Sequence, residues 1–280
     1  MKIKILSDST CDLSQELVEK YDITILPLTV IKAGEQFADG VTITPAEIFA
    51  HVAAGGDLCS TTAINIGEYE ELFAKYASDY DGVIHINIGS GFSSCHQNAR
   101  LAAEDYPNVR VIDSMNLATG QGHVVLEACR LAKTCQSLDE IEEKLNAFTP
   151  RVEASFLLDQ LKYMVKGGRC SSVAALGANL LGLKPCIEVK GGKMSVVKKY
   201  RGTYAKCLAS YVKERLADRE DINRGTLFLT YTTVEDDCRS AVVGAIEQHG
   251  HFNTVYETTA GCTVSCHCGP ATLGVLFVRK

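Results

Sequence analysis

The sequence predicts an α/β protein whose first half contains a parallel sheet. Short apolar runs typical of strands alternate there with segments of helical spacing, and polar turns close the runs. Strands that alternate with helices favour a parallel sheet with helices on its faces. The chain has 280 residues, which makes two domains more probable than one. A shift in composition near Pro150 and Arg151 predicts the boundary, with domains at 1–151 and 152–280.

The first half begins with a strand, a loop and a helix. The apolar run 3–6 is closed by a turn, a helix is expected at 14–21, and 23–31 returns to strand-like composition. Thr44-Pro45-Ala46-Glu47 predicts a helix start, because threonine caps, proline fits the first turn and glutamate follows three residues after the cap. The other elements expected here are helices at 67–80 and from about residue 93, strands at 83–88 and 109–112, and a helix from the capping signature Ser137-Leu138-Asp139-Glu140 to Asn146.

The second half opens with a strand-like run at 152–158 and a helical stretch at 160–166. A helix over 172–183 is apolar on almost all sides and must therefore be buried. It is either a core helix between the domains or the wall of an apolar cavity beside Gly177 and Ala178. The remaining expectations are a hairpin that joins 185–189 to 194–199 through Gly191-Gly192, helices at 204–216 and 234–249, and strands at 226–231 and 273–278.

Composition narrows the classes of partner and the compartment. The net charge of -6, without an extended basic run, does not favour nucleic acid or an anionic membrane as a partner. No apolar run approaches the roughly 20 residues of a membrane span, and the first residues do not develop a signal-peptide core. We expect a cytoplasmic protein whose 12 scattered cysteines are reduced.

Four turns rich in hydroxyl side chains each follow a strand-like run. Loops at the carboxyl ends of parallel strands gather around a crevice, so these turns are candidates for one shared ligand site. None carries an obvious catalytic base, which favours the binding of an anion in a neutral cradle over the breaking of a bond. Each turn alone is explained equally by ordinary caps and turns. The turns are Ser7-Asp8-Ser9-Thr10, Ser60-Thr61-Thr62, Gly89-Ser90-Gly91-Phe92-Ser93-Ser94 and Asp113-Ser114.

Ser93 is the strongest single candidate among the hydroxyls. It lies near an expected helix start, where backbone amides and the helix dipole favour an anion. A hydrolase or acyl transferase that uses Ser93 with His96 or His267 as base is the alternative, although a Gly-x-Ser-x-Gly elbow is missing. A third reading is a module that binds nucleotides or sugar phosphates, although Gly89-Ser90-Gly91 differs from both nucleotide fingerprints.

Cysteine and histidine are dense at 262–268, which raises the question of zinc. Adjacent residues in Cys266-His267-Cys268 do not readily share one tetrahedron, and no second cysteine pair completes a site, so we expect no metal. His267 is interpreted as a donor to an anion or as a loop histidine with ordinary partners. A nucleophilic role for Cys266 or Cys268 lacks a partnered base.

Four segments resemble the DegV family of bacterial fatty-acid-binding proteins in their order and spacing. The resemblance covers nearly the whole chain, about residues 3–279, and its most specific part begins at Lys166-Gly167-Gly168-Arg169. The segments are Ile5 to Leu13, Val111-Ile112-Asp113-Ser114 with Gly120 and Gly122, Lys166 to Arg169 through Leu183-Lys184-Pro185 to Tyr200-Arg201-Gly202, and His267-Cys268-Gly269-Pro270 with Gly274.

The resemblance implies a parallel-sheet N-terminal domain and a C-terminal α/β sandwich with a lipid tunnel between them. It implies a carrier without catalytic machinery or cofactor, which presents the carboxylate of a long-chain fatty acid to a separate fatty acid kinase that makes an acyl phosphate for phospholipid synthesis. Thr62 and Ser93 match the family's head-group residues, with Thr61, Ser94 and His267 nearby. Arg201 and its neighbour Lys198 match a basic segment expected to face the kinase.

The chain departs from the family pattern beside both head-group residues. Ala63-Ile64-Asn65 stands where the family has Gln-Pro-Ser, and Ser94-Cys95-His96 stands where it has Gly-Thr-Tyr. The two hydroxyls are retained. The departures leave open which acyl chain fits, and whether the cargo is another amphiphilic acid.

Overall fold

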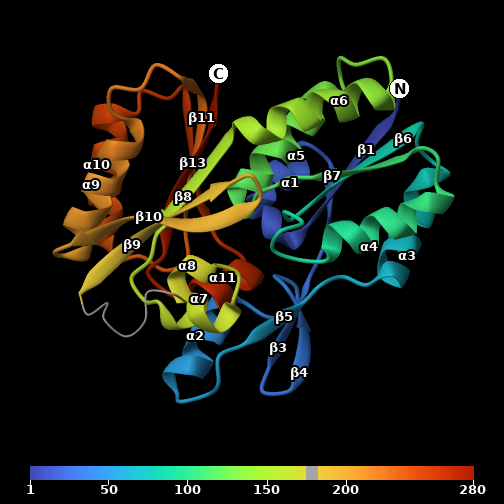
Figure 1. Cartoon of the computed structure of the whole chain (residues 1–280). Coiled ribbons are helices and arrows are strands. Elements are labelled where there is room, and N and C mark those ends of the chain that lie inside the picture. The colour runs from blue at the N-terminus through green and yellow to red at the C-terminus, as the bar shows by residue number, and fades with distance from the viewer. Residues whose placement is uncertain (175–181) are drawn as a thin grey trace.

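The computed structural model of this chain describes residues 1–174 and 182–280. It contains the expected parallel sheet, which is formed by strands from the first 113 residues (Figure 1). The register places Ile5 opposite Ile23 on one side and Ile84 on the other. The strands, in spatial order, are β2 (Ile23–Leu26), β1 (Ile3–Asp8), β6 (Gly82–Asn87) and β7 (Val109–Asp113).

Helices cover both faces of the parallel sheet. Val83 points toward Tyr69 and Phe73 in one buried cluster, whereas Ile84 packs with Val124 in another. Successive residues of one strand therefore enter opposite cores, which explains why β6 is buried along its whole length. The helices are α3 (Ile66–Ala77) and α4 (Cys95–Ala102) on one face, and α5 (Thr119–Leu131) and α6 (Leu138–Phe148) on the other, with α1 (Gln15–Lys20) after the first strand.

A six-stranded mixed sheet forms the second half of the molecule. Its order is β10-β9-β8-β13-β11-β12. One face packs against two helices, and the other turns Ala154, Phe156 and Leu276 toward a core shared with the first half. The elements are β8 (Val152–Leu157), β9 (Leu183–Lys190), β10 (Lys193–Arg201), β11 (Ile222–Tyr231), β12 (Thr254–Thr259) and β13 (Leu273–Arg279), with helices α9 (Tyr204–Leu216) and α10 (Asp236–His249).

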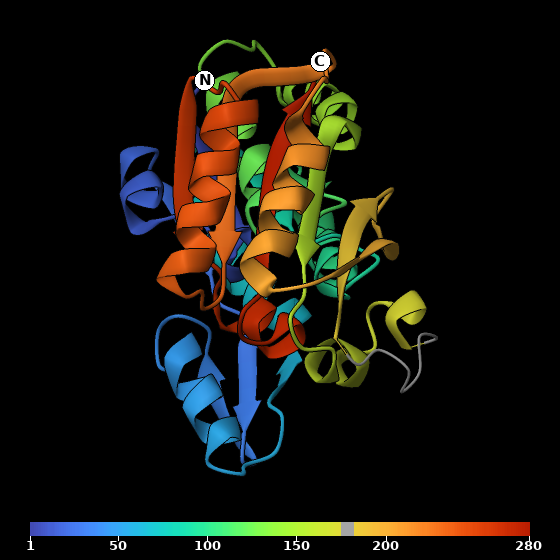
Figure 2. The same ribbon diagram turned by 90° about the vertical axis from the view of Figure 1, so that its left-hand side faces the viewer.

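A small third sheet lies at one end of the molecule, with a short helix between it and the six-stranded sheet (Figure 2). That helix is α11 (Cys262–Cys268), and its Cys262 and Cys266 pack with Val30 and Ile48. The other elements of this end are β3 (Thr29–Lys32), β4 (Glu35–Ala38), β5 (Ser60–Thr62), α2 (Pro45–Ala53), α7 (Lys162–Gly167) and α8 (Ser171–Ala174).

The expected single strand at 23–31 is wrong. The segment is divided at Pro27 and Leu28 into β2, which joins the parallel sheet, and β3, which joins the small sheet. Proline has no N–H to donate to a strand ladder, so the chain changes sheets there. Five further strands and longer helices of the described residues escaped the sequence prediction, namely β4, β5, β12, α5 and α11.

Both predicted helix caps form, although the second is one-sided. Thr44 and Glu47 bond each other's backbone in a complete capping box. Ser137 Oγ accepts a hydrogen bond from Glu140 N at 3.1 Å. Glu140 reaches back to the N–H of Gln136, at 2.8 Å, instead of the N–H of the cap residue.

The glycine pair forms the predicted hairpin turn between β9 and β10. Gly191 and Gly192 have φ angles of +57° and +71°, which suit glycine best. The expected helix at 172–183 is described only at its ends, where α8 includes its start and Leu183 already belongs to β9. Gly177 and Ala178, the residues of the predicted cavity wall, lie outside the described residues.

The predicted boundary at residue 151 coincides with the start of β8 in the six-stranded sheet, and it stays a prediction. None of the helices in the described ranges has the length and apolar character that a membrane crossing requires.

Candidate functional site

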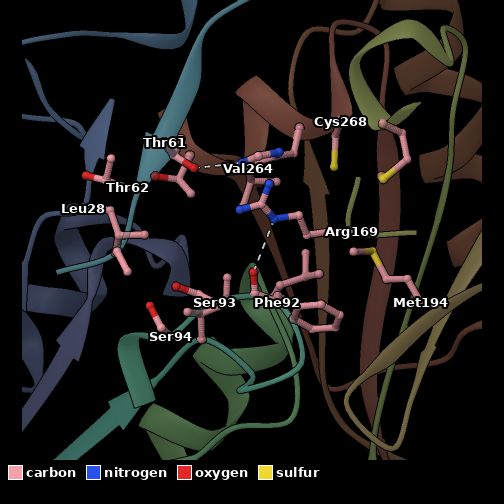
Figure 3. Close-up of a pocket in the computed structure, with 16 residues that line it drawn as sticks. Leu28, Thr61, Thr62, Phe92, Ser93, Ser94, Arg169, Met194, Val264 and Cys268 are labelled. Carbon is pink, nitrogen blue, oxygen red and sulfur yellow. Dashed lines mark hydrogen bonds between the residues drawn. The ribbon is translucent and has the colours of Figure 1, made fainter. Parts of the chain in front are cut away.

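A cavity with about 730 Å³ of empty space, partly open to solvent, lies between the two halves of the molecule. Segments from both halves line it, and Figure 3 shows their side chains directed toward a common centre. Its apolar wall consists of Leu28, Ala63, Ile88, Phe92, Leu117, Met164, Met194, Val264 and Cys268. Its polar side chains are Thr61, Thr62, Ser93, Ser94, Thr263, Arg169 and His267.

Two of the four hydroxyl turns line the cavity and two do not. The segment Ser60-Thr61-Thr62, predicted as a turn, is strand β5, and it contributes Thr61 and Thr62. The loop after β6 contributes Ser93 and Ser94. The two turns that reach the cavity are those to which the family resemblance assigns the head-group residues, and the other two are engaged in bonds within the protein.

The first hydroxyl turn, Ser7-Asp8-Ser9-Thr10, belongs to a buried polar network. Ser7 Oγ donates to the carbonyl of Ile86 at 3.0 Å, and Thr10 Oγ1 donates to Gln121 Oε1 at 2.8 Å. The fourth turn, Asp113-Ser114, holds the loop after β6, because Ser90 Oγ donates a hydrogen bond to Asp113 Oδ2 at 2.5 Å. These turns fix the loops that carry the cavity residues.

Thr61 and His267 form a hydrogen-bonded pair across the cavity wall. Thr61 Oγ1 lies 2.8 Å from His267 Nε2, although 206 positions separate the two residues in sequence (Figure 3). Burial and the nearby positive charge of Arg169 lower the pKa of His267 to about 4. The imidazole is therefore neutral near pH 7, with one nitrogen able to donate and the other to accept.

His267 lies on helix α11 and not in a loop, which corrects the sequence interpretation. The segment is rich in cysteine, threonine and serine, which are modest helix formers. A distant carboxylate supplies its cap: Asp39 accepts hydrogen bonds from the N–H groups of Cys262 and Thr263 at 2.8 and 3.1 Å. Tertiary contacts therefore create this helix, and the segment itself contains no local sequence signal from which a helix could be predicted.

Ser93 lies two positions before Cys95, the first residue of α4, and therefore near the helix start that the sequence predicted. Its Oγ accepts from the N–H of Cys95 at 3.3 Å and lies 3.2 Å from Cys95 Sγ, to which it donates. No bond joins Ser93 to a histidine among the described residues. Thr62 and Ser94 also line the cavity, and both are exposed.

Arg169 is a cavity residue to which the sequence prediction gave no role. It follows Gly168, whose φ of +68° ends α7, and its guanidinium donates to the carbonyls of Gly167 and Phe92. Among the described residues that line the cavity, it is the one with a full positive charge, because His267 is neutral. The neutral cradle expected from the hydroxyl turns is therefore wrong.

The two residues predicted to face a partner lie away from the cavity, on β10 at an edge of the six-stranded sheet. Lys198 forms an ion pair with Glu214 at 2.6 Å. Arg201 is exposed, and within 1–174 and 182–280 it has no ion-pair partner. Nothing in this arrangement assigns them to a partner.

All 12 cysteines are free thiols with buried side chains. Burial raises the pKa of Cys268 to about 12 and raises the pKa of Cys266 as well, which makes both poor nucleophiles near pH 7. In the described part of the chain, histidine, cysteine and acidic side chains form no group of three suited to a metal ion.

The fold and the site define an α/β protein with a cavity between its two halves, mainly apolar with hydroxyls, a neutral histidine and one arginine in its wall. The family model described as "Uncharacterised protein, DegV family" matches residues 2–280. A DegV domain-containing protein of Clostridium acetobutylicum is 34% identical over 282 residues, with 100% of this chain and 99% of the relative covered. The chain belongs to the DegV family.

Solved structures agree with this assignment. A DegV family protein from Thermus thermophilus, described by its fatty acid binding, is 27% identical with a TM-score of 0.92, and both chains are covered completely. A stearic acid-binding protein from Eubacterium ventriosum is 26% identical with a TM-score of 0.83, with 99% of this chain and 98% of the other covered.

Proposed function

We propose that this protein binds a long-chain fatty acid in the cavity, with the carboxylate against the polar side chains and the hydrocarbon tail against the apolar wall. The observation that carries the proposal is the joint presence of Arg169, His267 and the hydroxyls in a cavity that is otherwise apolar. The fatty-acid-binding relatives support the same ligand class.

The site supplies donors of the right kind for a carboxylate. Thr62 and Ser93 are the proposed direct contacts, with Thr61, Ser94 and His267 around them. Arg169 adds the positive charge that the hydroxyls lack, and hydrogen bonds between charged groups are roughly twice as strong as neutral ones. A neutral His267 orients Thr61 without adding a second charge.

Tail and head group have different roles in this proposal. Each buried methylene contributes roughly 0.8 kcal/mol, whereas a neutral hydrogen bond contributes about 0.5 to 1.5 kcal/mol. A long alkyl chain therefore supplies most of the affinity. The polar side chains fix which end of the ligand reaches the mouth of the cavity.

We further propose a cytoplasmic carrier that presents the carboxylate to a separate kinase, which forms the acyl phosphate. The partly open cavity supports this role, because a partner can reach a head group held near the surface. Arg201 and Lys198 are the proposed contacts for the kinase. Arg201 is the stronger candidate for this contact, because Lys198 already forms an ion pair with Glu214.

A hydrolase that uses Ser93 receives less support from the geometry. The hydroxyl of Ser93 donates to Cys95 Sγ, and His267 bonds to Thr61. His96 makes no hydrogen bond to Ser93 among the described residues, and its buried Nδ1 has no partner there, so neither histidine activates the serine in this arrangement. Turnover of short acyl esters that is lost in Ser93→Ala would favour the hydrolase.

The head-group assignment is tested with the double variant Thr62→Ala/Ser93→Ala. We expect stearic acid binding to weaken on the order of tenfold, because two hydrogen bonds are lost and the tail contacts remain. The carboxyl ¹³C resonance of labelled stearic acid should shift, and acyl-phosphate formation by the partner kinase should fall sharply. Ser240→Ala, an exposed serine on α10, is the matched control. Unchanged acyl-phosphate formation in the double variant would refute the assigned roles.

A further inference from the structure

The hydroxyl of Ser93, a proposed contact for the carboxylate, has a single side-chain partner among the described residues. Ser93 Oγ donates to Cys95 Sγ at 3.2 Å and accepts from the N–H of Cys95 at 3.3 Å. The hydroxyl proton is therefore engaged with a sulfur atom. A carboxylate can accept this proton in a hydrogen bond only after the hydroxyl turns away from the sulfur, because a hydroxyl has one proton to donate.

The sulfur belongs to a neutral thiol, which makes it a weak acceptor. Cys95 is the first residue of α4 and is completely buried. Burial raises the pKa of this thiol, and the nearby charge of Asp8 raises it further, although hydrogen bonds such as the one from Ser93 lower it in part. The thiol is therefore uncharged near pH 7, and uncharged sulfur accepts hydrogen bonds only weakly. Release of the Ser93 hydroxyl from sulfur thus costs less free energy than release from an oxygen acceptor.

Buried groups hold the sulfur in its place. The backbone of Ile64 and the hydroxyl of Tyr69 form hydrogen bonds with Cys95. The Tyr69 hydroxyl in turn accepts from Asn87 Nδ2 at 2.9 Å, and both of these side chains are completely buried. The thiol is therefore fixed from the protein core, whereas Ser93 is half-buried and lines the cavity. The hydroxyl can turn while the sulfur keeps its position.

We propose that Cys95 is a positioning residue for the carboxylate, which holds the Ser93 hydroxyl in place before binding and, as a weak acceptor, releases it to the ligand. The inference rests on the proposed function and adds a residue that acts through Ser93 without touching the ligand. An oxygen in place of the sulfur would compete with the carboxylate for the same proton. A side chain without an acceptor would leave that proton free. Replacement by serine and replacement by alanine should therefore have different effects on binding.

The experiment measures stearic acid binding to the purified full-length protein and its variants. We expect Cys95→Ser to weaken binding about fivefold, which corresponds to one neutral hydrogen bond that the ligand must displace. Cys95→Ala leaves a small cavity, so its melting temperature should fall, but its affinity should stay within about twofold of the wild type. Cys207→Ser is the matched control, because Cys207 is a similarly buried thiol on α9 in the separate core, and it should bind as the wild type does.

A double-mutant cycle with Ser93→Ala separates positioning from packing. If Cys95 acts through the Ser93 hydroxyl, Cys95→Ser should have no further effect on stearic acid binding once that hydroxyl is removed. A loss that persists in the Ser93→Ala background would overturn the inference, as would an unchanged affinity of Cys95→Ser alone or equal losses in Cys95→Ser and Cys95→Ala. The cycle uses only the two conservative replacements, so the test remains decisive if Cys95→Ala does not fold.

Infrared spectroscopy provides an independent signature of the same contact. The S–H stretching band of Cys95, identified by its loss in Cys95→Ser, should shift when stearic acid binds, because the Ser93 hydroxyl leaves the sulfur. A band that does not move on binding would contradict the inference, while fatty acid binding itself stands. A wild type that shows no stearic acid binding would instead overturn the proposed function on which the inference rests.

Discussion

Arg169 determines the electrostatic character of the site. The other side chains that line the cavity in residues 1–174 and 182–280 are neutral, including His267, whose pKa is lowered to about 4. The guanidinium is exposed, so solvent and salt reduce its contribution. It therefore favours an acid over a neutral amphiphile by a modest amount, which an experiment can isolate.

Replacement of Arg169 by glutamine should separate acids from alcohols. We expect Arg169→Gln to weaken stearic acid binding about fivefold at low salt, which corresponds to roughly 1 kcal/mol for an exposed charge. Binding of stearyl alcohol should change little, and Arg169→Lys should retain most of the preference for the acid. Titrations of both ligands at low and high salt provide the measurement. Equal losses for acid and alcohol would assign Arg169 a packing role.

The sequence allowed some of the cavity residues to be predicted and not others. The family resemblance identified Thr62 and Ser93, and both line the cavity, although Thr62 belongs to strand β5 of the small sheet and not to a loop of the parallel sheet. The role of Arg169 was not predictable, because its approach to Phe92 depends on how α7 packs against a segment 77 residues away in sequence. The direction of a basic side chain that follows two glycines cannot be predicted from the sequence, because it depends on the tertiary fold.

At the scale of elements, α11 links the site to the rest of the molecule. Four of its side chains line the cavity between the two halves, namely Thr263, Val264, His267 and Cys268. Its amino end depends on Asp39, which is only 4% exposed and comes from the loop after β4. The loop of the small sheet thereby fixes the helix that positions the histidine.

Removal of this cap should damage both stability and binding. We expect Asp39→Ala to lower the free energy of unfolding by about 2 kcal/mol, since two buried N–H groups lose a charged acceptor. Stearic acid affinity should fall in parallel, because His267 and Thr61 lose their support. Asp39→Asn retains one acceptor oxygen and should lose less, and Asp57→Ala is an exposed control. Chemical denaturation and ligand titration measure both effects. An undiminished unfolding free energy in Asp39→Ala would contradict the role of the cap.

Elements whose signals are local were predictable, and elements created by distant contacts were not. The Gly191-Gly192 hairpin and the Thr44 cap carry their own turn and capping chemistry. Helix α11 depends on a carboxylate 223 positions away. Pro27 indicated a break in the sequence, because proline interrupts strand ladders. The apolar residues on either side nevertheless led to the prediction of one strand over 23–31.

At the scale of the whole molecule, the cavity exists because two sheets share one core. The parallel sheet contributes Leu6 and Val83 to this core, and the six-stranded sheet contributes Phe156 and Leu276. The cavity opens where this shared core reaches the loops of the first half and α11. Alternation of strands and helices predicted the parallel sheet. A cavity between the two halves was expected from the family resemblance, whereas the residue patterns indicated only a shared site for the hydroxyl turns, because the cavity walls join residues far apart in sequence.

The most direct test of the central claim is native mass spectrometry of the purified full-length protein, followed by gentle organic extraction. Slow dissociation of a largely buried chain favours survival of the ligand through purification. We expect one long-chain fatty acid per protein, or thermal stabilisation when stearic acid is added to protein stripped of lipid. Absence of a co-purified fatty acid together with no stabilisation by stearic acid would contradict the account, and stabilisation by sugar phosphates instead would favour a phosphate-binding module.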